Sequence, residues 1–282
     1  MTTTSPKDQN PRWQPIKAYE DLEFLNSSNA RAIRVLCELI HPKELFRKSN
    51  VHNTVVFFGS ARTISKEQAE AKLREINNII AEEENSSQEL FDLKKQAEID
   101  LKMSKYYEDS AELAEKLTRW SLDIEDPRKR FVICSGGGPG IMEAANLGAK
   151  KAGGKSVGLN ISLPFEQEPN MYQTPEISFE FHYFFIRKFW FFYLSKAMVV
   201  FPGGYGTMDE FFELLTLVQT AKTKKYMPIA VYGSEYWKKI INFDAMAEFG
   251  AISPEDQQLF HFVDDVNSAF EFLKTELTKH YL

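Results

Sequence analysis

Short apolar runs alternate with stretches of helical spacing along the second half of the chain, and this alternation predicts the fold class. The runs rich in β-branched and aromatic residues predict strands at 54–58, 131–134, 156–160, 177–181, 197–201, 228–232 and 260–263. The stretches between them predict helices that end near Lys151 and Thr220, and helices over 182–195, 236–248 and 266–279. Repeated strand-then-helix units predict an α/β fold, with a mostly parallel sheet and helices on both faces.

Three other segments do not follow this alternation. Residues 1–17 carry little apolar surface and are expected to form a tail, and 21–45 should form one or two amphipathic helices that Pro42 ends. Residues 65–126 are charged and rich in good helix formers, which predicts two or three helices with a break near 85–87. The part that ends near Trp120 should cross over to the second strand. The expected organisation is therefore an N-terminal tail with helices over 1–50, and one domain over 51–282 with a helical insertion at about 65–126.

Composition narrows the classes of function. Of the 282 residues, 43% are apolar and 26% are charged, and the net charge of −6 argues against a general nucleic-acid binder. Cys37 and Cys134 lie far apart, and none of the five histidines shows metal-ligand spacing. The chain has no long uncharged apolar stretch, so we expect a cytoplasmic protein that binds neither membranes nor nucleic acid.

A glycine-rich turn, Ser135–Gly140, connects an expected strand to an expected helix. Ligands of parallel sheets bind outside the carboxyl ends of the strands, and a helix start presents free N–H groups to an anion. The turn does not match the dinucleotide fingerprint, because Ile141 stands where that pattern needs glycine, and it is not a P-loop. The turn either binds a phosphate or is a tight strand-to-helix connection without a ligand.

A second turn, Pro202–Glu210, repeats this arrangement after the strand at 197–201. Two such turns at one sheet edge could grip a phosphoester from both sides. Thr207 and Glu210 also fit the Thr-x-x-Glu capping box, which would need no substrate. A carboxylate beside a bound phosphate is repelled by it, so a site with both must direct Glu210 at another part of the ligand.

The segment Tyr183–Tyr193 is aromatic on every side and contains Arg187. A desolvated guanidinium needs an anionic partner, which could be a phosphate or a structural Asp or Glu. So much aromatic surface exceeds what one sheet face can cover, and we therefore expect a homodimer.

Taken in order, four elements resemble the LOG family of nucleoside 5'-monophosphate phosphoribohydrolases, proteins long described as lysine decarboxylases. These elements are Gly59-Ser60, Ser135-Gly-Gly-Gly-Pro-Gly-Ile-Met-Glu143, Arg187-Lys188 and Pro202-Gly-Gly-Tyr-Gly-Thr-Met-Asp-Glu210. The resemblance covers about Val51 to Leu273 and implies a Rossmann-like fold and a dimer with its site near the subunit contact. It also implies cleavage of the N-glycosidic bond of AMP or N6-modified AMP, which gives free base and ribose 5-phosphate without a metal or organic cofactor.

The resemblance also assigns residues. It implies that Glu210 and Arg187 are catalytic, and that the substrate is bound by Ser60, Gly136, Gly137, Gly138, Glu143, Lys188, Gly203, Gly204, Gly206 and Thr207. Phe184-Phe185-Ile186 stands where plant-type members carry Met-His-x, and those members lack the N-terminal part and the insertion. These departures favour a general purine mononucleotide nucleosidase over a cytokinin-specific one.

The expected mechanism is hydrolysis through an oxocarbenium-like ribosyl transition state, with Glu210 steadying the positive charge or orienting the water. The alternative is a carrier or sensor that binds a phosphoester without cleaving it, in which Glu210 only caps its helix. Lysine decarboxylation ranks last, because that chemistry needs a pyridoxal Schiff-base lysine and no histidine here is followed by lysine.

Overall fold

The computed structural model describes residues 15–82, 87–164 and 168–282. The expected tail therefore lies largely outside the described residues. The chain divides into two compact units, with the boundary between His41 and Pro42. In the first unit, α1 (Leu22–Asn26) begins at Asp21, whose carboxylate accepts the N–H of Phe24, and η1 (Ser28–Ala30) follows. Helix α2 (Arg31–Lys48) starts there and runs across the boundary.

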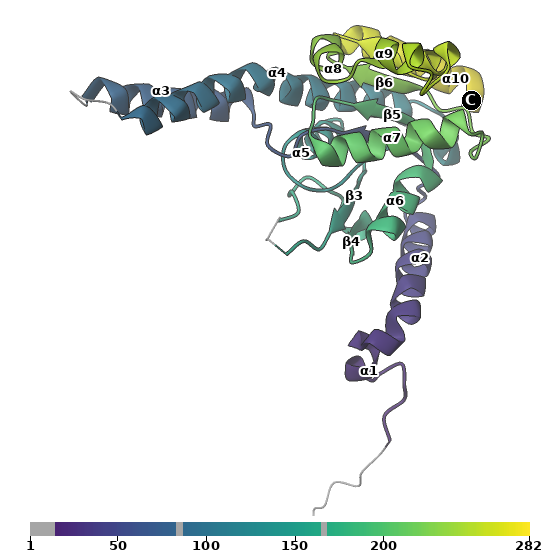
Figure 1. Cartoon of the computed structure of the whole chain (residues 1–282). Coiled ribbons are helices and arrows are strands. Elements are labelled where there is room, and N and C mark those ends of the chain that lie inside the picture. Colours follow the sequence, from purple (N-terminus) through teal and green to yellow (C-terminus); the bar gives the residue numbers. More distant parts are fainter. Residues whose placement is uncertain (1–14, 83–86, 165–167) are drawn as a thin grey trace, which may run out of the picture. The chain divides into compact units, whose positions relative to one another are not determined.

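The second unit is built on a seven-stranded sheet with the order β4-β3-β2-β1-β5-β6-β7, in which all neighbours pair in parallel (Figure 1). Its strands are β1 (Asn53–Phe58), β2 (Phe131–Ser135), β3 (Ser156–Ile161), β4 (Ser178–Phe181), β5 (Ser195–Val200), β6 (Ile229–Tyr232) and β7 (His261–Val263). Every expected strand is present, and the predicted α/β, Rossmann-like fold is confirmed.

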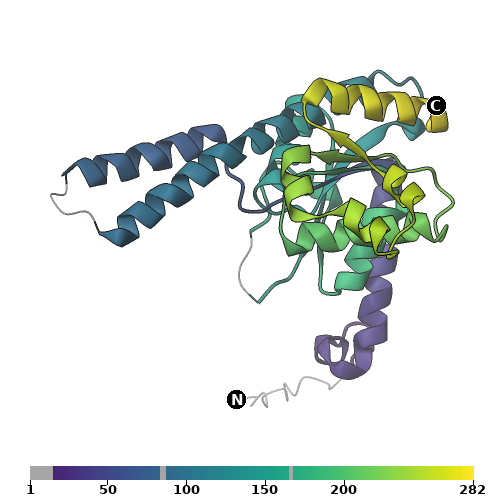
Figure 2. The ribbon, with the colours of Figure 1, turned by 45° about the horizontal axis from the view of Figure 1, so that its top comes forward.

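Helices cover both faces of this sheet. The helices of this unit are α3 (Lys66–Glu82), α4 (Gln88–Leu122), α5 (Ile141–Lys151), α6 (Phe184–Tyr193), α7 (Tyr205–Gln219), α8 (Ser234–Ile240), α9 (Phe243–Glu248) and α10 (Val266–Tyr281), with short 3-10 turns η2 (Pro127–Lys129), η3 (Pro175–Ile177) and η4 (Pro254–Leu259). Of these, α3 and the first part of α4 extend away from the sheet (Figure 1). Helices α4, α5 and α10 pack on one face, and α6 and α7 lie on the other (Figure 2). None of the described helices combines the length and apolar composition that crossing a bilayer requires.

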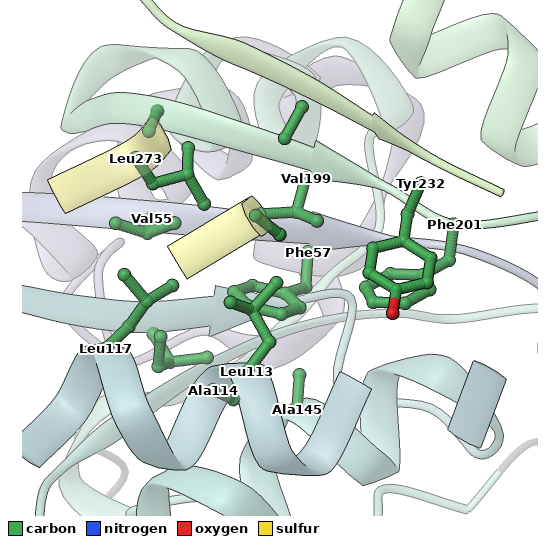
Figure 3. Packing of buried hydrophobic residues seen from close by; sticks show 14 of the residues in the cluster. Val55, Phe57, Leu113, Ala114, Leu117, Ala145, Val199, Phe201, Tyr232 and Leu273 are labelled. Carbon is green, nitrogen blue, oxygen red and sulfur yellow. The ribbon is translucent and has the colours of Figure 1, made fainter. Parts of the chain in front are cut away.

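Alternation along β1 sends side chains to both layers of the core. Val55 and Phe57 face α4, where they meet Leu113 and Leu117 (Figure 3). Phe58 points to the opposite face, where its ring lies 4.8 Å from that of Phe191 on α6. Because β1 is buried on both faces, it is an uninterrupted apolar run.

Two expectations about helix ends are wrong. Pro42 does not end α2, which continues to Lys48. Proline in a helix interior removes one hydrogen bond, but the following turn is anchored because the Phe46 ring lies 5.0 Å from Phe179 and 5.3 Å from Trp190. The helix expected over 236–248 is two helices, since Asn242 caps a new one by accepting the N–H of Ala245.

The predicted insertion consists of α3 and the first part of α4. Lys72 on α3 pairs with Asp100 on α4 at 2.7 Å, and Ala69, Ile76 and Ala97 are buried. Ser87 caps α4 by accepting the N–H of Leu90, whereas positions 85 and 86 of the expected break lie outside the described residues. The second half of α4 packs on the sheet as the predicted crossover helix.

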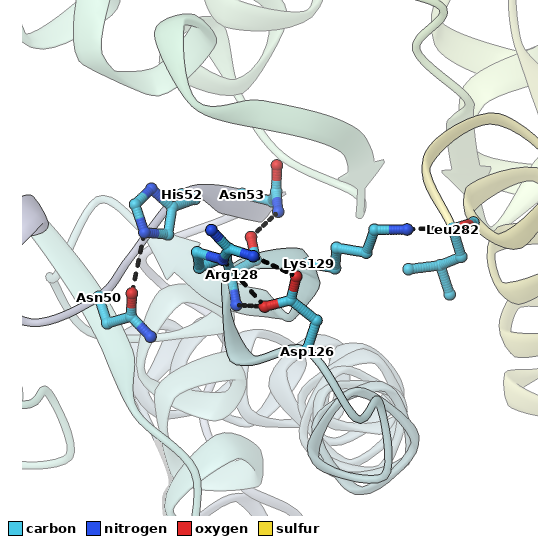
Figure 4. A network of polar contacts seen from close by, with 7 residues as sticks. All are labelled: Asn50, His52, Asn53, Asp126, Arg128, Lys129 and Leu282. Atoms are coloured by element: carbon cyan, nitrogen blue, oxygen red, sulfur yellow. Dashed lines mark hydrogen bonds and ion pairs between the residues drawn. The ribbon is translucent and has the colours of Figure 1, made fainter.

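A polar network fixes the amino edge of the sheet. The Asn53 amide at the start of β1 donates to the carbonyl oxygens of Arg128 and Arg130 at 3.0 and 3.4 Å, respectively. Lys129 donates to the main-chain oxygen of Leu282 at 2.8 Å (Figure 4). These bonds join β1, the start of β2 and the end of α10, on the edge opposite to the glycine-rich turns.

The α4–α5 contact generates a stability prediction. A Cβ at Gly148 on α5 would lie 2.1 Å from the carbonyl oxygen of Ala111 on α4. Gly148→Ala should therefore lower the free energy of unfolding by about 2 kcal/mol, although alanine is ordinarily the better helix former. Urea denaturation measures the change. Lys151→Ala, at an exposed position of the same helix, should change stability by less than about 0.5 kcal/mol, and equal stabilities of the two variants would refute the close contact.

Candidate functional site

The site lies where the order of the strands reverses, between β1 and β5. From β1 the chain proceeds to β2, β3 and β4 on one side, and β5, β6 and β7 continue on the other. The Ser60 N–H, just beyond β1, donates to the Pro202 carbonyl at 3.0 Å, and the Ile141 N–H donates to the Ser60 carbonyl at 3.1 Å. These bonds bring three loops together around a cavity of about 760 Å³. Open α/β sheets bind ligands at such a reversal.

Eight of the twelve residues expected in the site line this cavity. They are Ser60, Gly136, Arg187, Gly203, Gly204, Gly206, Thr207 and Glu210. The other four, Gly137, Gly138, Glu143 and Lys188, lie outside the lining and are described below.

The turn after β5 presents the uncapped start of α7. The helix begins at Tyr205 with Gly204 as its N-cap, and within the described chain no side chain caps it. Thr207 is therefore the third helical residue and Glu210 lies one turn further in, so the capping-box interpretation is wrong. The Tyr236 hydroxyl donates a hydrogen bond to the Gly203 carbonyl oxygen at 2.7 Å, so that oxygen has a partner. The N–H groups of the first turn remain available to an anion at the positive end of the helix.

The turn after β2 needs glycine for close approach. A Cβ at Gly136 would lie 2.5 Å from Nη2 of Arg187, and one at Gly140 would lie 2.3 Å from the Ser60 carbonyl oxygen. Gly140 also has a φ of +71°, a conformation that other residues adopt at a cost. The glycines thus admit the guanidinium and the β1 loop.

Arg187 reaches the cavity from α6 and is held by main-chain oxygens. Its Nε donates to the Leu159 carbonyl at 2.7 Å and its Nη2 to the Gly136 carbonyl at 3.3 Å, and the guanidinium lies over the Phe191 ring. No carboxylate of the described residues forms an ion pair with it, so the structural Asp or Glu pair is not formed. Burial lowers the pKa of Arg187, and the Coulombic effect of Glu210 opposes that shift. A half-buried guanidinium that forms no ion pair favours an anionic ligand.

Glu210 contributes a carboxyl group to the cavity lining. Its side chain is on α7 and the residue is 6% exposed. Its Oε2 is buried and accepts no hydrogen bond from the described residues. Burial raises the pKa of Glu210 to about 7, although the nearby charges of Lys188 and Arg187 act to lower it. A carboxyl group with a pKa near neutrality, in a cavity, is typical of functional sites.

Lys188 and Glu143 have partners elsewhere. Lys188 lies 2.7 Å from the carboxylates of both Asp209 and Glu213. Burial acts to lower the pKa of Lys188, but these two hydrogen bonds outweigh it and the pKa is raised. Glu143 accepts the Tyr107 hydroxyl of α4 at 2.8 Å. Both side chains therefore stabilise contacts between helices.

Several lining residues were not expected from the sequence. Arg62 lies two residues after Ser60, so its position in the sequence could have suggested that it lines the cavity. Its main-chain N–H donates to Ser60 Oγ at 3.1 Å. Met103 lies on the inserted part of α4, and no local sequence pattern predicts that it lines the cavity. Much of the remaining wall is apolar, and includes Phe58, Met142, Ile161, Leu163, Phe184 and Phe191.

Comparisons with known proteins gave one family-model match and several solved structures of low sequence identity. Residues 142–273 match a family model described as "Possible lysine decarboxylase", and the match includes Arg187 and Glu210. No protein of curated function matches the chain. Among solved structures, TM1055, a structural genomics target, shares 16% identity at a TM-score of 0.45, covering 79% of this chain and 99% of its own. The Moco carrier protein from Chlamydomonas reinhardtii shares 19% identity at a TM-score of 0.44, covering 80% and 99%.

The raised pKa of Glu210 predicts how stability depends on pH. Between its ordinary value of 4.5 and about 7, folded Glu210 keeps a proton that the unfolded chain has released. The free energy of unfolding must therefore fall as pH rises through this window. Relative to Glu210→Gln, the wild type should lose on the order of 3 kcal/mol between pH 4.5 and 7.

Urea denaturation of both proteins across this range measures the difference. Glu125→Gln, at an exposed position, is the control, and its free energy of unfolding should depend on pH as that of the wild type does. If the curves of wild type and Glu210→Gln are also parallel, Glu210 has an ordinary pKa and the assignment is wrong.

Proposed function

We propose that this chain, whose residues 142–273 match the family model described as "Possible lysine decarboxylase" and whose motifs resemble the LOG family, hydrolyses the N-glycosidic bond of purine nucleoside 5'-monophosphates. The observation that carries the proposal is that one cavity holds a guanidinium and a carboxyl group, neither of which forms an ion pair within the described residues. Arg187 and Glu210 line it together with an uncapped helix start. The phosphate of the substrate suits the Arg187 guanidinium and the N–H groups of the helix start. The anomeric carbon of its ribose suits the Glu210 carboxylate.

The phosphate binds to the turn between Gly203 and Thr207. The free N–H groups at the start of α7 donate to its oxygens, and the remaining donors of Arg187 form charge-assisted hydrogen bonds with it. This binding fixes the ribose, so that energy gained at the phosphate lowers the barrier at the sugar carbon. Substrates without phosphate are therefore expected to react slowly.

Glu210 acts on the ribose. Above a pH of about 7 its carboxylate is ionised and stabilises the positive charge that develops as the glycosidic bond breaks. The base leaves with the electrons of that bond, and the oxygen of a water molecule bonds to the anomeric carbon. The proton that this water loses balances the proton that the base takes up. Since the carboxylate is repelled by the phosphate, it faces the sugar instead.

The apolar wall receives the base. Phe184 offers a flat aromatic face and Met142 an adaptable apolar contact, both of which suit a purine ring. A lysine decarboxylase would need an amine for its Schiff base, and within the described residues no lysine lines the cavity. The family description therefore does not indicate this protein's chemistry.

We also propose that the protein is a homodimer through α6. Phe184, Phe185, Phe189 and Tyr193 are between 42% and 60% exposed on this helix, a surface that is costly to leave in water. Because Arg187 lies on the same helix, the proposed contact would adjoin the cavity.

Incubation with AMP tests the reaction directly. Chromatography should detect adenine and ribose 5-phosphate in equal amounts, whereas adenosine should be cleaved at least about 100 times more slowly, because it lacks the anchoring anion. Binding of AMP without release of adenine would instead support a non-catalytic carrier or sensor.

Glu210→Gln tests the catalytic carboxylate. The amide keeps the shape of the side chain but cannot carry charge, so kcat should fall by about 10²–10⁴-fold while the affinity for ribose 5-phosphate is retained. Glu125→Gln should keep full activity. A fully active Glu210→Gln protein would show that the acid plays no part in the reaction.

Analytical ultracentrifugation tests the dimer. Phe185→Asp should convert it to a monomer at micromolar concentration, because burying an unpaired carboxylate costs several kcal/mol. Phe91→Asp, at a 50% exposed position on α4, is the matched control and should leave the dimer intact. A wild type that sediments as a monomer at all concentrations would exclude the contact.

A further inference from the structure

Several buried or half-buried amides lie together beneath the glycine turn after β2, and three of them are on β3 or on the segment that follows it. We call Asn160, Asn170 and Gln173 the amide cluster. Asn160 is on β3, and the other two lie on the segment between β3 and β4. Asn160 and Gln173 are each 8% exposed. Buried amides carry both donors and acceptors, so each must find several partners at once.

The cluster donates three hydrogen bonds to the Gly137 carbonyl oxygen. That oxygen accepts from the main-chain N–H of Asn170 at 2.8 Å, from its side-chain Nδ2 at 2.9 Å and from Nε2 of Gln173 at 2.7 Å. Asn170 Nδ2 also donates to the Gly138 carbonyl at 3.0 Å. Gly137 and Gly138, which do not line the cavity, thus direct their carbonyl groups toward this cluster.

The same cluster holds β3. Nδ2 of Asn160 donates to Oε1 of Gln173 at 3.0 Å and to the Phe179 carbonyl of β4 at 2.9 Å. Gly137 has a φ of +75°, and a Cβ there would lie 2.1 Å from Oδ1 of Asn160. The turn and the strand are therefore packed directly against each other through the Asn160 amide.

Each of the two carbonyl groups that orient Arg187 is adjacent in sequence to a residue held by the cluster. Nη2 of Arg187 donates to Gly136, next to Gly137, and Nε donates to Leu159, next to Asn160. Planar peptide groups transmit orientation from one residue to the next, because only two torsion angles separate them. A change in the cluster should therefore move both acceptors of the guanidinium.

We propose that Gln173, with Asn160 and Asn170, positions Arg187 for ligand binding. Gln173 connects the two arms, since its Nε2 bonds to Gly137 and its Oε1 accepts from Asn160. It is a positioning residue, because it lies outside the cavity lining and acts through main-chain carbonyl groups. Its effect on turnover rests on the proposed function, whereas its effect on Arg187 does not.

Hydrogen exchange of the Arg187 Nε–H tests this without any substrate. Its NMR signal is assigned by its loss in Arg187→Lys. In Gln173→Met, which keeps the side-chain length but loses the amide, exchange should be at least about tenfold faster because the Leu159 and Gly136 acceptors are released. Asn53→Leu removes an amide with two main-chain acceptors at the opposite edge of the sheet and should leave this exchange unchanged.

Unchanged exchange in folded Gln173→Met would overturn the proposal, as would equal acceleration in Asn53→Leu. If Gln173→Met does not fold, Asn170→Ala, at a half-buried position, is measured by the same criterion.

A double-mutant cycle extends the test to turnover of AMP. Gln173→Met should lower kcat/KM about tenfold in the wild type and leave it unchanged in the Arg187→Lys background, since the group it positions is then altered. Equal losses in both backgrounds would mean that Gln173 does not act through Arg187. If the wild type releases no adenine, the proposed function fails while the exchange experiment still decides the positioning role.

Discussion

The backbone hydrogen bonds of Ser60 are the constraint on which the site depends. Its N–H binds the loop after β5 and its carbonyl binds the start of α5, so one peptide segment joins three strands at the carboxyl edge. Parallel pairing brings these ends into register, but only close contact of the backbones makes a cavity of them. Gly140 permits that contact, since a Cβ there would lie 2.3 Å from the Ser60 carbonyl oxygen, while Gly136 and Gly203 leave room for the side chains of Arg187 and Thr207.

The ionised forms of Glu210 and Arg187 in this cavity are costly to the free energy of folding. Burial raises the pKa of Glu210 and lowers that of Arg187, so folding works against the ionised form of both. In contrast, Lys188 is paired with two carboxylates on α7. Among the described residues, Lys188 thus has two acidic partners, whereas the hydrogen bonds of the neighbouring Arg187 go to main-chain oxygens. A ligand that carries a negative charge would restore the missing interaction, which is why the proposed function assigns Arg187 to the phosphate.

Much of the fold could be predicted from the sequence, because its signals are local. Buried parallel strands are continuous apolar runs, and glycine marks their ends, so all seven strands were found. The errors arose where tertiary contacts override local rules. Proline should end α2, yet the packing of Phe46 against Phe179 and Trp190 stabilises another turn and a half beyond it. Likewise, the break between α8 and α9 depends on the cap supplied by Asn242.

The sequence motifs predicted eight of the residues that line the cavity. They did not predict the hydrogen-bond partners of those residues. Glu210 fitted two interpretations by sequence, and only the start of α7 at Tyr205 separates them, since a capping acid must lie at the third helical position. Similarly, Gly136 and Gly137 are neighbours in one motif, but their carbonyl groups point to different partners, one to Arg187 and the other to the amide cluster. The motif thus serves two tasks at once: one peptide contacts the cavity and the next anchors it. Asn160, Asn170 and Gln173 lie far from any glycine motif, so only the folded chain connects them to the guanidinium they support.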